Sequence, residues 1–275
     1  MWRWYQRMML FLSDRLVCVS QAVADQFTYL SERSRLVVLH NGFPRDEYES
    51  VSSDRIARFA TTYGVTGKVV VGVVGRIKCG RKGQDVFLRA AALLKDDFPN
   101  AVFVLIGSPF PGNEAHLKEV QHIVQILRLE DRVVYTGDVD DIKAAYAALD
   151  VSVLPSALPE PFGGVVIESM ALGKPVVGTN VGGTPEQIEE GVTGFLVEPN
   201  DATSLTAAIR QLLADSDLRR RMGAAGRRLY LDRFEFEHFY ETILQLYHDV
   251  INASGKTHCP ALPAAPGAVM TSTRG

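Results

Sequence analysis

The feature that most constrains this chain is a regular alternation of short β-branched runs with longer helical patterns. Runs rich in Val, Ile and Leu predict strands at 15–20, 36–39, 69–74, 102–106, 133–135, 151–154 and 176–179. Several runs are almost continuously apolar, which is typical of strands covered on both faces of a parallel sheet. Helical patterns lie between them at 85–94, 116–127, 142–148 and 165–172. The alternation predicts an α/β fold with a doubly wound, Rossmann-like parallel sheet.

A change of pattern at residues 40–44 divides the chain. Residues 1–44 contain two predicted strands and two helices, which is too little to form a core, so they read as the last part of another unit. Residues 45–251 begin with a charged segment and continue as the strand–helix series. They end in helices predicted at 202–213, 217–231 and 235–251. Residues 252–275, rich in Pro, Ala, Gly, Ser and Thr, predict a disordered tail.

Composition excludes several classes of protein. Of 275 residues, 47% are hydrophobic and 22% are charged, which is globular composition. The net charge of −3 and the lack of a basic block argue against a nucleic-acid partner. Three distant cysteines disfavour a disulfide framework and a Cys-rich zinc site, and they suit a reducing compartment. Residues 1–12 lack the features of a secretory signal and predict a helix that packs on the protein or lies on a membrane surface.

Ligands of a doubly wound sheet bind beyond the carboxyl ends of its strands, so the loops there are the candidates. The loop after residues 69–74 begins with Gly75 and Arg76 and ends with Lys82 and Gly83. Its glycines allow close approach of the backbone, and its cations lie beside a helix N-terminus that offers free N–H groups. Gly83 stands where a phosphate loop needs Ser or Thr. Taken alone, this loop favours a solvated turn, and an anion site is the alternative.

A second loop follows residues 151–154. Gly163 and Gly164 open the next helix and can offer amides to a phosphate, while Glu160 precedes them and Glu168 lies about one turn further on. Carboxylates accept hydrogen bonds from hydroxyls, and the amides and cations neutralise phosphate oxygens. The two loops together predict a ligand with several hydroxyls on a diphosphate. Taken singly, each glutamate is better explained as a surface charge, but taken with the first loop it is not.

Further turns end the remaining strands. Gly107 follows one strand, and Gly137 with Val139 follows the next, where backbone groups could line a slot for a base. The pair Gly182-Gly183 predicts another stretch of backbone open to a ligand. His40 is a minor candidate because it alone among the histidines lies beside a glycine turn at a strand end. The acidic run at 138–141 is interpreted as structural rather than metal-binding.

Taken together, these loops resemble the donor-binding half of retaining GT-B glycosyltransferases, in the glycosyltransferase family 4 group. The resemblance covers residues 69–201 and is carried by Gly75-Arg76, Lys82-Gly83, the Glu160 and Glu168 pair with seven residues between, and the segments 155–156, 173–177, 182–186 and 191–194. It implies a GT-B donor half with C-terminal helices at 45–251, preceded at 1–44 by the remnant of an acceptor domain and a linker.

The resemblance also implies roles for individual residues. Arg76 and Lys82 would bind the donor diphosphate and stabilise charge on the departing nucleotide, and Glu160 would hold the sugar hydroxyls, so these three would be catalytic. Glu168 would bind the ribose. The other donor-binding positions that it implies are Gly75, Gly107, Gly137, Val139, Phe162, Gly163, Gly164 and Val165.

The predicted activity is transfer of a sugar from a UDP-, GDP- or ADP-sugar to an unknown carbohydrate or lipid acceptor, with retention of configuration and without metal or cofactor. We expect it in the cytoplasm or at the inner face of the membrane. Because only the end of an acceptor domain is present, a second chain could supply the rest, or the chain could be a non-catalytic nucleotide-sugar-binding subunit or fragment. An epimerase is disfavoured by the spacing of Glu160 and Glu168 and by the pair Arg76 and Lys82. A glycosidase is disfavoured by the phosphate-suited glycines and cations.

Overall fold

The computed structural model describes residues 2–27 and 35–253, so the predicted tail lies outside the described residues from 254 onward. Its main sheet has six parallel strands in the order β5-β4-β3-β6-β7-β8. They are β3 (Val69–Val74), β4 (Ala101–Ile106), β5 (Val133–Gly137), β6 (Val151–Leu154), β7 (Val176–Thr179) and β8 (Gly194–Val197). The predicted α/β fold and doubly wound parallel sheet are confirmed. The edge strand β8 was not predicted.

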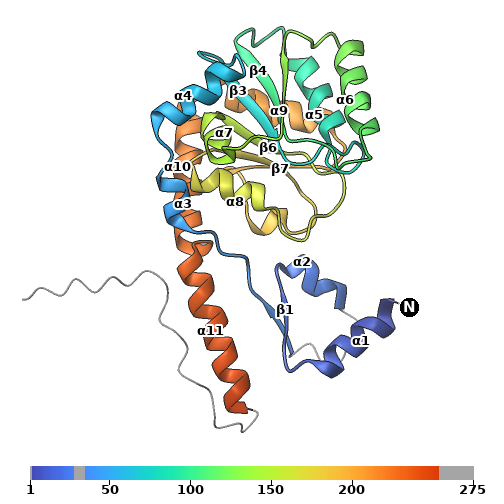
Figure 1. Ribbon diagram of the computed structural model, residues 1–275, viewed down its shortest axis with the longest axis vertical. Helices are drawn as coiled ribbons and strands as arrows, with labels where there is room; N and C mark the ends of the chain where they lie inside the picture. The colour runs from blue at the N-terminus through green and yellow to red at the C-terminus, as the bar shows by residue number, and fades with distance from the viewer. Residues whose placement is uncertain (1, 28–34, 254–275) are drawn as a thin grey trace, which may run out of the picture.

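Helices cover both faces of this sheet (Figure 1). One face packs against α5 (Gln84–Leu94), α6 (Ala115–Ile126) and α9 (Ala202–Ala214). The other packs against α4 (Ser53–Thr62), α7 (Ile142–Ala148) and α8 (Gly164–Ala171), and α10 (Ser216–Arg233) lies against α8. The residues of β3 show why the strands are so apolar. Val71 and Val73 enter the first core and Val70 and Val74 the second, since successive side chains point to opposite faces.

The N-terminal segment, described at residues 2–27 and 35–44, forms a small unit with its own two-stranded sheet. It contains α1 (Trp2–Leu12), β1 (Leu16–Cys18), α2 (Gln21–Ala24), a 3-10 turn (Asp25–Phe27) and β2 (Leu36–Val38). The two strands pair in parallel, and their small core consists of Cys18, Ala24 and Phe27. On α1, Gln6 and Leu10 are buried while Trp4 and Phe11 are exposed. The predicted helix therefore exists, but much of its apolar side is uncovered.

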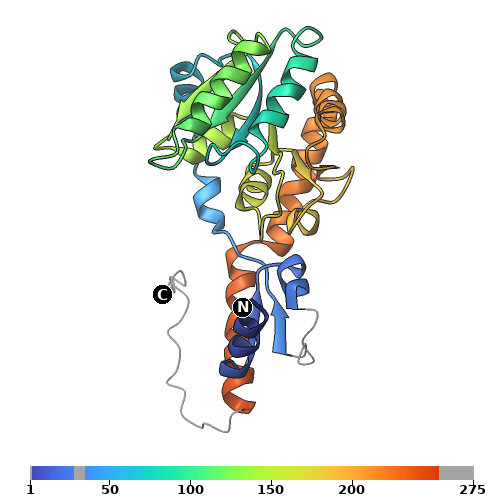
Figure 2. The same cartoon turned by 90° about the vertical axis from the view of Figure 1, so that its right-hand side faces the viewer.

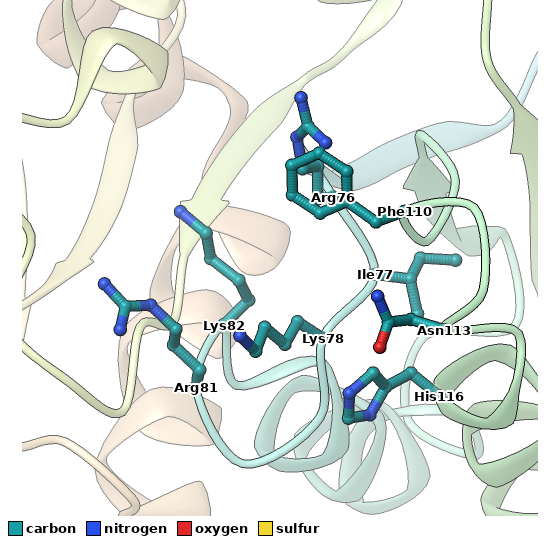
Figure 3. Close-up of a pocket in the computed structure, with 8 residues that line it drawn as sticks. All are labelled: Arg76, Ile77, Lys78, Arg81, Lys82, Phe110, Asn113 and His116. Atoms are coloured by element: carbon teal, nitrogen blue, oxygen red, sulfur yellow. The ribbon is translucent and has the colours of Figure 1, made fainter.

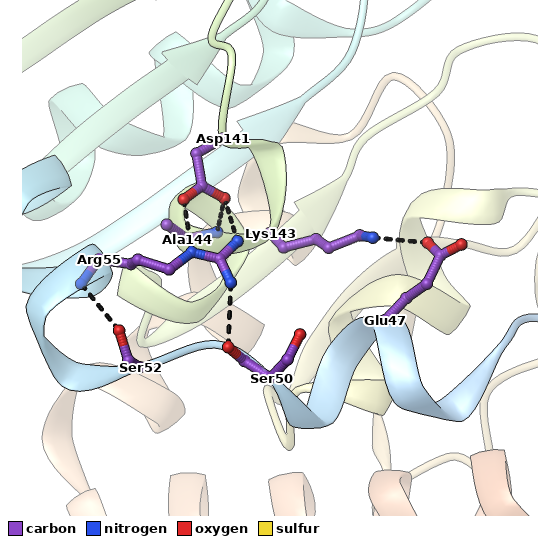
Figure 4. Close-up of polar contacts among 7 residues, drawn as sticks. All are labelled: Glu47, Ser50, Ser52, Arg55, Asp141, Lys143 and Ala144. Atoms are coloured by element: carbon purple, nitrogen blue, oxygen red, sulfur yellow. Dashed lines mark hydrogen bonds and ion pairs between the residues drawn. The ribbon is translucent and has the colours of Figure 1, made fainter.

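The charged segment that begins at residue 45 forms two helices that the sequence analysis did not predict, α3 (Arg45–Glu49) and α4. Their charges are paired with α7 (Figure 4). Arg55 donates from Nε and Nη2 to both carboxylate oxygens of Asp141, at 2.7 Å each, and Asp141 also accepts from the amide of Ala144 at the start of α7. The structural interpretation of this acidic residue is confirmed.

The linker between the two units is bound to the junction of α10 and α11 (Phe236–Ala253). The amide of Phe43 donates to Phe234 at 2.9 Å, and the amide of Phe236 donates back to Phe43 at 3.1 Å. The helix α11 and the N-terminal segment extend from the same end of the donor unit, residues 45–235 (Figures 1 and 2). Across residues 2–27 and 35–253, no helix has the length and apolarity needed to cross a bilayer.

Candidate functional site

The candidate site lies where the strand order of the sheet reverses, between β3 and β6. Ligands of doubly wound sheets bind at such a switch point, outside the carboxyl ends of the strands. The loop 75–83 follows β3 and the loop 155–163 follows β6. The two loops are packed together, because the amide of Ala157 donates to Arg81 at 2.8 Å. Gly83 has φ +69°, and a Cβ there would lie 1.8 Å from the carbonyl oxygen of Pro155, so only glycine fits.

Lys82 and Glu160, predicted as catalytic from different loops, are in direct contact. Lys82 Nζ lies 2.6 Å from Glu160 Oε1, and the hydroxyl of Ser156 donates to the same oxygen. The side chains are only 29% and 15% exposed, so the pair is partly shielded from water. The fold thus brings together a cation and a carboxylate that lie 78 residues apart.

Arg76 is held in place by Gln84, a residue that the sequence analysis did not identify. Gln84 is buried at the start of α5, and its amide nitrogen donates to the carbonyl of Arg76 at 2.8 Å. Its amide oxygen accepts from the backbone N–H of Lys78 at 3.3 Å. The guanidinium of Arg76 lies over the ring of Phe110, 3.2 Å from its centroid, in a cation–π contact. The available signal in the sequence was a glutamine directly after a glycine turn, at the start of a predicted helix.

A hollow of about 300 Å³ lies beyond β3, β4 and β5. Four predicted donor-binding residues line it, namely Gly75, Arg76, Gly107 and Val139, beside Val74, Ile106, Ser108, Asp138 and Ile142. Gly107 has φ +124°, and a Cβ there would lie 2.4 Å from the carbonyl oxygen of Gly75. Gly107 also donates to the carbonyl of Gly137 at 2.9 Å. The glycines therefore let three strand ends converge on a largely apolar hollow, and its volume suits a small ligand.

A second, smaller hollow of about 150 Å³ shares Arg76 with the first. We call it the basic hollow because Arg76, Lys78, Arg81 and Lys82 all line it, together with Ile77, Phe110, Asn113 and His116 (Figure 3). The thiol of Cys79 in the same loop is not a nucleophile. Burial, assisted by Glu119 and Asp85, raises the pKa of this thiol to about 12, so it stays protonated at neutral pH.

The start of α8 holds the remaining predicted donor residues, Phe162, Gly163, Gly164 and Val165. Gly163 is the N-cap, and the first N–H groups of a helix have no partner within the helix. Glu168 lies one turn further on and accepts hydrogen bonds from Tyr146 at 2.6 Å and Tyr48 at 3.4 Å. Burial, reinforced by the charge of Glu168, raises the pKa of the Tyr146 hydroxyl well above its ordinary value. Glu168 is therefore bound to α7 and α3, and it is not among the residues lining either hollow.

The loop that holds the glycine pair 182–183 meets the Glu160 loop. The amide of Gly183 donates to the carbonyl of Glu160 at 2.9 Å. That amide is consequently occupied inside the protein, contrary to the expectation that this backbone is open to a ligand. This hydrogen bond instead holds the backbone of Glu160 in place.

Glu186, at the end of the 3-10 turn Thr184–Glu186, connects the donor unit to the N-terminal segment. Its carboxylate accepts from the amides of Gln21 at 2.7 Å and Ala22 at 3.0 Å, and it lies 3.0 Å from His40 Nε2. Burial tends to raise the pKa of Glu186, but the amides and His40 outweigh it, so the pKa is lowered. We call these contacts the Glu186 clasp.

His40, the minor candidate, belongs to this clasp and also stacks on Phe162, with ring centroids 5.3 Å apart. It therefore connects the linker to the loop before α8. Within the part of the chain that the structure describes, no group of three or more His, Cys, Asp or Glu side chains is placed to hold a metal ion.

Known proteins resemble this chain in sequence and in fold. The family model described as glycosyl transferases group 1 matches residues 60–229, which is more than half of the chain. A D-inositol 3-phosphate glycosyltransferase of Streptomyces avermitilis is 32% identical over 225 residues, covering 78% of this chain and 48% of that protein. The chain spans about half the length of the curated relatives it matches.

Two solved structures are similar in fold. The Anabaena protein Alr3699/HepE, in complex with UDP and glucose, has a TM-score of 0.80 and 29% identity, covering 86% of this chain and 63% of that one. The C-terminal domain of a glycosyl transferase group 1 family protein (LpcC) from Francisella tularensis has a TM-score of 0.63 and 28% identity. That match covers 70% of this chain and 99% of the domain.

Proposed function

This chain belongs to the glycosyl transferases group 1 family, and we propose that it provides the donor site of a transferase that moves a sugar from a nucleoside-diphosphate sugar to an acceptor. One observation carries the proposal most directly. Lys82 and Glu160, from the loops that follow β3 and β6, meet at 2.6 Å at the switch point of the sheet. UDP and glucose bound in the similar Anabaena structure support a nucleotide-sugar donor.

In the proposed site the base lies in the hollow beyond β3, β4 and β5, and the diphosphate lies between Arg76, Lys82 and the first turn of α8. Charge develops on the departing nucleotide, and fixed cations and amides facing it lower the barrier because they need no reorganisation. Glu160 would exchange part of its contact with Lys82 for hydroxyls of the sugar. We propose Arg76 and Lys82 in the role that a metal ion would otherwise have, and retention of configuration as the family resemblance implies.

The acceptor side is the second part of the proposal. The N-terminal segment has two strands of three residues and an α1 with exposed Trp4 and Phe11. We propose that these surfaces are completed by an acceptor-binding domain, from the same polypeptide or a second chain. A carbohydrate or lipid acceptor, in the cytoplasm or at the inner face of the membrane, is compatible with this arrangement.

A non-catalytic role is the second candidate, and a specific observation supports it. The chain covers 48% of one relative and 45% of another, so its similarity to these transferases concerns only part of their length. In that case the chain would bind a nucleotide sugar or a partner without turnover.

Calorimetric titration of the chain with UDP, GDP and ADP, without added metal, tests the donor site. We expect saturable binding of one nucleotide. Arg76→Ala should weaken it by about 1.5–3 kcal/mol, or about 10- to 150-fold, the range for a charge-assisted hydrogen bond. Arg228→Ala, an exposed arginine on α10, is the matched control and should bind normally. Binding of no nucleotide, or equal binding by Arg76→Ala, would overturn the site.

With binding established, release of free sugar from the donor separates the two candidate functions. Turnover that is lost in Lys82→Ala supports the transferase. Binding without turnover, even with a broad set of acceptors, supports the non-catalytic subunit.

A further inference from the structure

The basic hollow holds more positive charge than the proposed donor diphosphate requires. Arg76 and Lys82 are assigned to the diphosphate, yet Lys78 and Arg81 line the same hollow. Its lining residues, all within the described chain, include neither Asp nor Glu. Figure 3 shows Arg81 and Lys82 on one side, Asn113 and His116 on the other, and Lys78 between them.

Within residues 2–27 and 35–253, the side chains of Lys78 and Arg81 make no hydrogen bond or ion pair. Among the described residues, Lys82 is the only one of the four cations that makes an ion pair, the one with Glu160. Like charges gathered in one concave site repel one another, and the walls of such a site focus the field and attract an anion. Lys82 is paired with Glu160, so the field that would attract an anion comes from Arg76, Lys78 and Arg81.

The backbone that carries these side chains is fixed in place. The carbonyl of Lys78 accepts from the amides of Arg81 at 3.3 Å and Lys82 at 2.9 Å, which closes the turn. Ala157 donates to the carbonyl of Arg81, and buried Gln84 holds the amide of Lys78. A turn fixed from three sides holds the backbone of Lys78 and Arg81 in place before a ligand arrives, which reduces the backbone entropy lost on binding.

We infer that the basic hollow is a second anion subsite, which binds a phosphate or carboxylate group of one of the two substrates through Lys78 and Arg81. This inference rests on the proposed function, because it places the subsite beside the donor diphosphate. Asn113 and His116 form the opposite wall and would add hydrogen-bond donors. The substrate that carries the anion is the donor sugar, as a uronic acid, or the acceptor, as a phosphorylated or carboxylated compound.

The test uses inorganic phosphate as the probe, on the full chain saturated with the nucleoside diphosphate that binds best. Amide NMR shifts of residues 76–83 are followed at constant ionic strength. We expect saturable shifts in the wild type and at least tenfold weaker phosphate binding in Lys78→Gln/Arg81→Gln. The control Lys68→Gln/Arg228→Gln removes the same charge from exposed positions outside the hollow and should bind phosphate like the wild type.

Phosphate that fails to saturate, or that binds the double variant and the wild type equally, would overturn the inference. A nucleoside diphosphate that binds the double variant normally separates this subsite from the donor site. If no nucleoside diphosphate binds at all, the proposed function fails. Phosphate is then titrated into the chain without nucleotide. Weaker phosphate binding by Lys78→Gln/Arg81→Gln than by the wild type still supports the subsite, and equal binding overturns it.

Two further arms identify the source of the anion. A nucleotide uronic acid that binds at least tenfold more tightly than the matching nucleotide hexose, with the preference lost in the double variant, assigns the subsite to the donor sugar. Phosphate that still binds when an intact nucleotide hexose fills the donor site assigns it to the acceptor.

Discussion

The donor unit and the N-terminal segment are built from the same kinds of element but differ in how they are held together. The donor unit has six strands between two layers of helices, with cores on both faces of its sheet. The segment has two strands of three residues around Cys18, Ala24 and Phe27. Burial of apolar area is the main stabilising term in folding, so the segment depends on its contacts with the donor unit.

Those contacts fall on the loops of the candidate site. His40 stacks on Phe162, directly before α8, and Glu186 follows the glycine pair that supports Glu160. We therefore expect a change in the docking of the N-terminal segment to shift the loops that carry Phe162 and Glu160. The sheet therefore fixes the loops of the site, and the Glu186 clasp holds the N-terminal segment against them.

The largest expected effect comes from the core of the donor unit. Phe103 is fully buried in β4, and Phe103→Ala should lower the free energy of unfolding by about 3–5 kcal/mol, the usual cost of emptying such a site. Phe27→Ala in the segment should leave the main unfolding transition in place, because Phe27 belongs to the small cluster. Denaturant unfolding measures both variants. Equal losses would mean that the two regions unfold as one unit.

The next effect concerns the Glu186 clasp. Glu186→Gln removes the charge that the amides of Gln21 and Ala22 and the ring of His40 share. Hydrogen bonds to a charged group contribute about 1.5–3 kcal/mol, so docking of the segment should weaken by that order. Amide exchange at Gln21 and Ala22 should accelerate at least tenfold, while exchange in β3 and β4 stays unchanged.

Glu189→Gln is the matched control for the clasp variant. Glu189 is exposed three residues further along, and it makes no ion pair within the described chain. Its amide exchange pattern should follow the wild type. Exchange at Gln21 that is equal in both variants would show that the segment is held by its apolar contacts alone.

The same clasp should be sensitive to acid. Burial raises the pKa of Glu186, but the amides and His40 lower it further, so the folded pKa lies below the ordinary value of about 4.3. A depressed carboxyl pKa contributes stability that is present above the unfolded pKa and lost as pH falls through the folded pKa. Docking should therefore be complete at pH 5 and weaken below about pH 4. Amide shifts of residues 20–24 report it, and Glu186→Gln should flatten this dependence.

The sequence analysis predicted the donor unit well for a physical reason. Strands buried on both faces leave continuous Val, Ile and Leu runs, so β3, β6 and β7 were predicted with their observed bounds. Short, partly exposed elements leave weaker signals. The edge strand β8 has two partly exposed residues, whereas β6 and β7 have the same length and are buried throughout. The helices α3 and α4 are rich in charge.

The residues of the candidate site also differ in how well the sequence predicts them. Loops at strand ends are predictable, because the sheet topology assigns them to one edge, and Lys82 and Glu160 do meet there. Residues whose role depends on a distant partner are not. Glu186 binds Gln21, 165 residues earlier, and nothing near Glu186 in the sequence indicates that contact. Gln84 was missed because its task is to hold backbone inside the loop.

The smallest expected effect tests the polar seam between α4 and α7. Arg55 makes a two-point contact with Asp141, and the side chains are 32% and 42% exposed, so water screens the pair. Arg55→Lys keeps the charge but loses the planar fork, and it should cause a small loss of unfolding free energy. Lys143→Gln, which breaks the single contact with Glu47, should cost less. Denaturant unfolding of both variants gives the ranking, and a larger loss in Lys143→Gln would show that charge alone, rather than two-point geometry, holds α4 on α7.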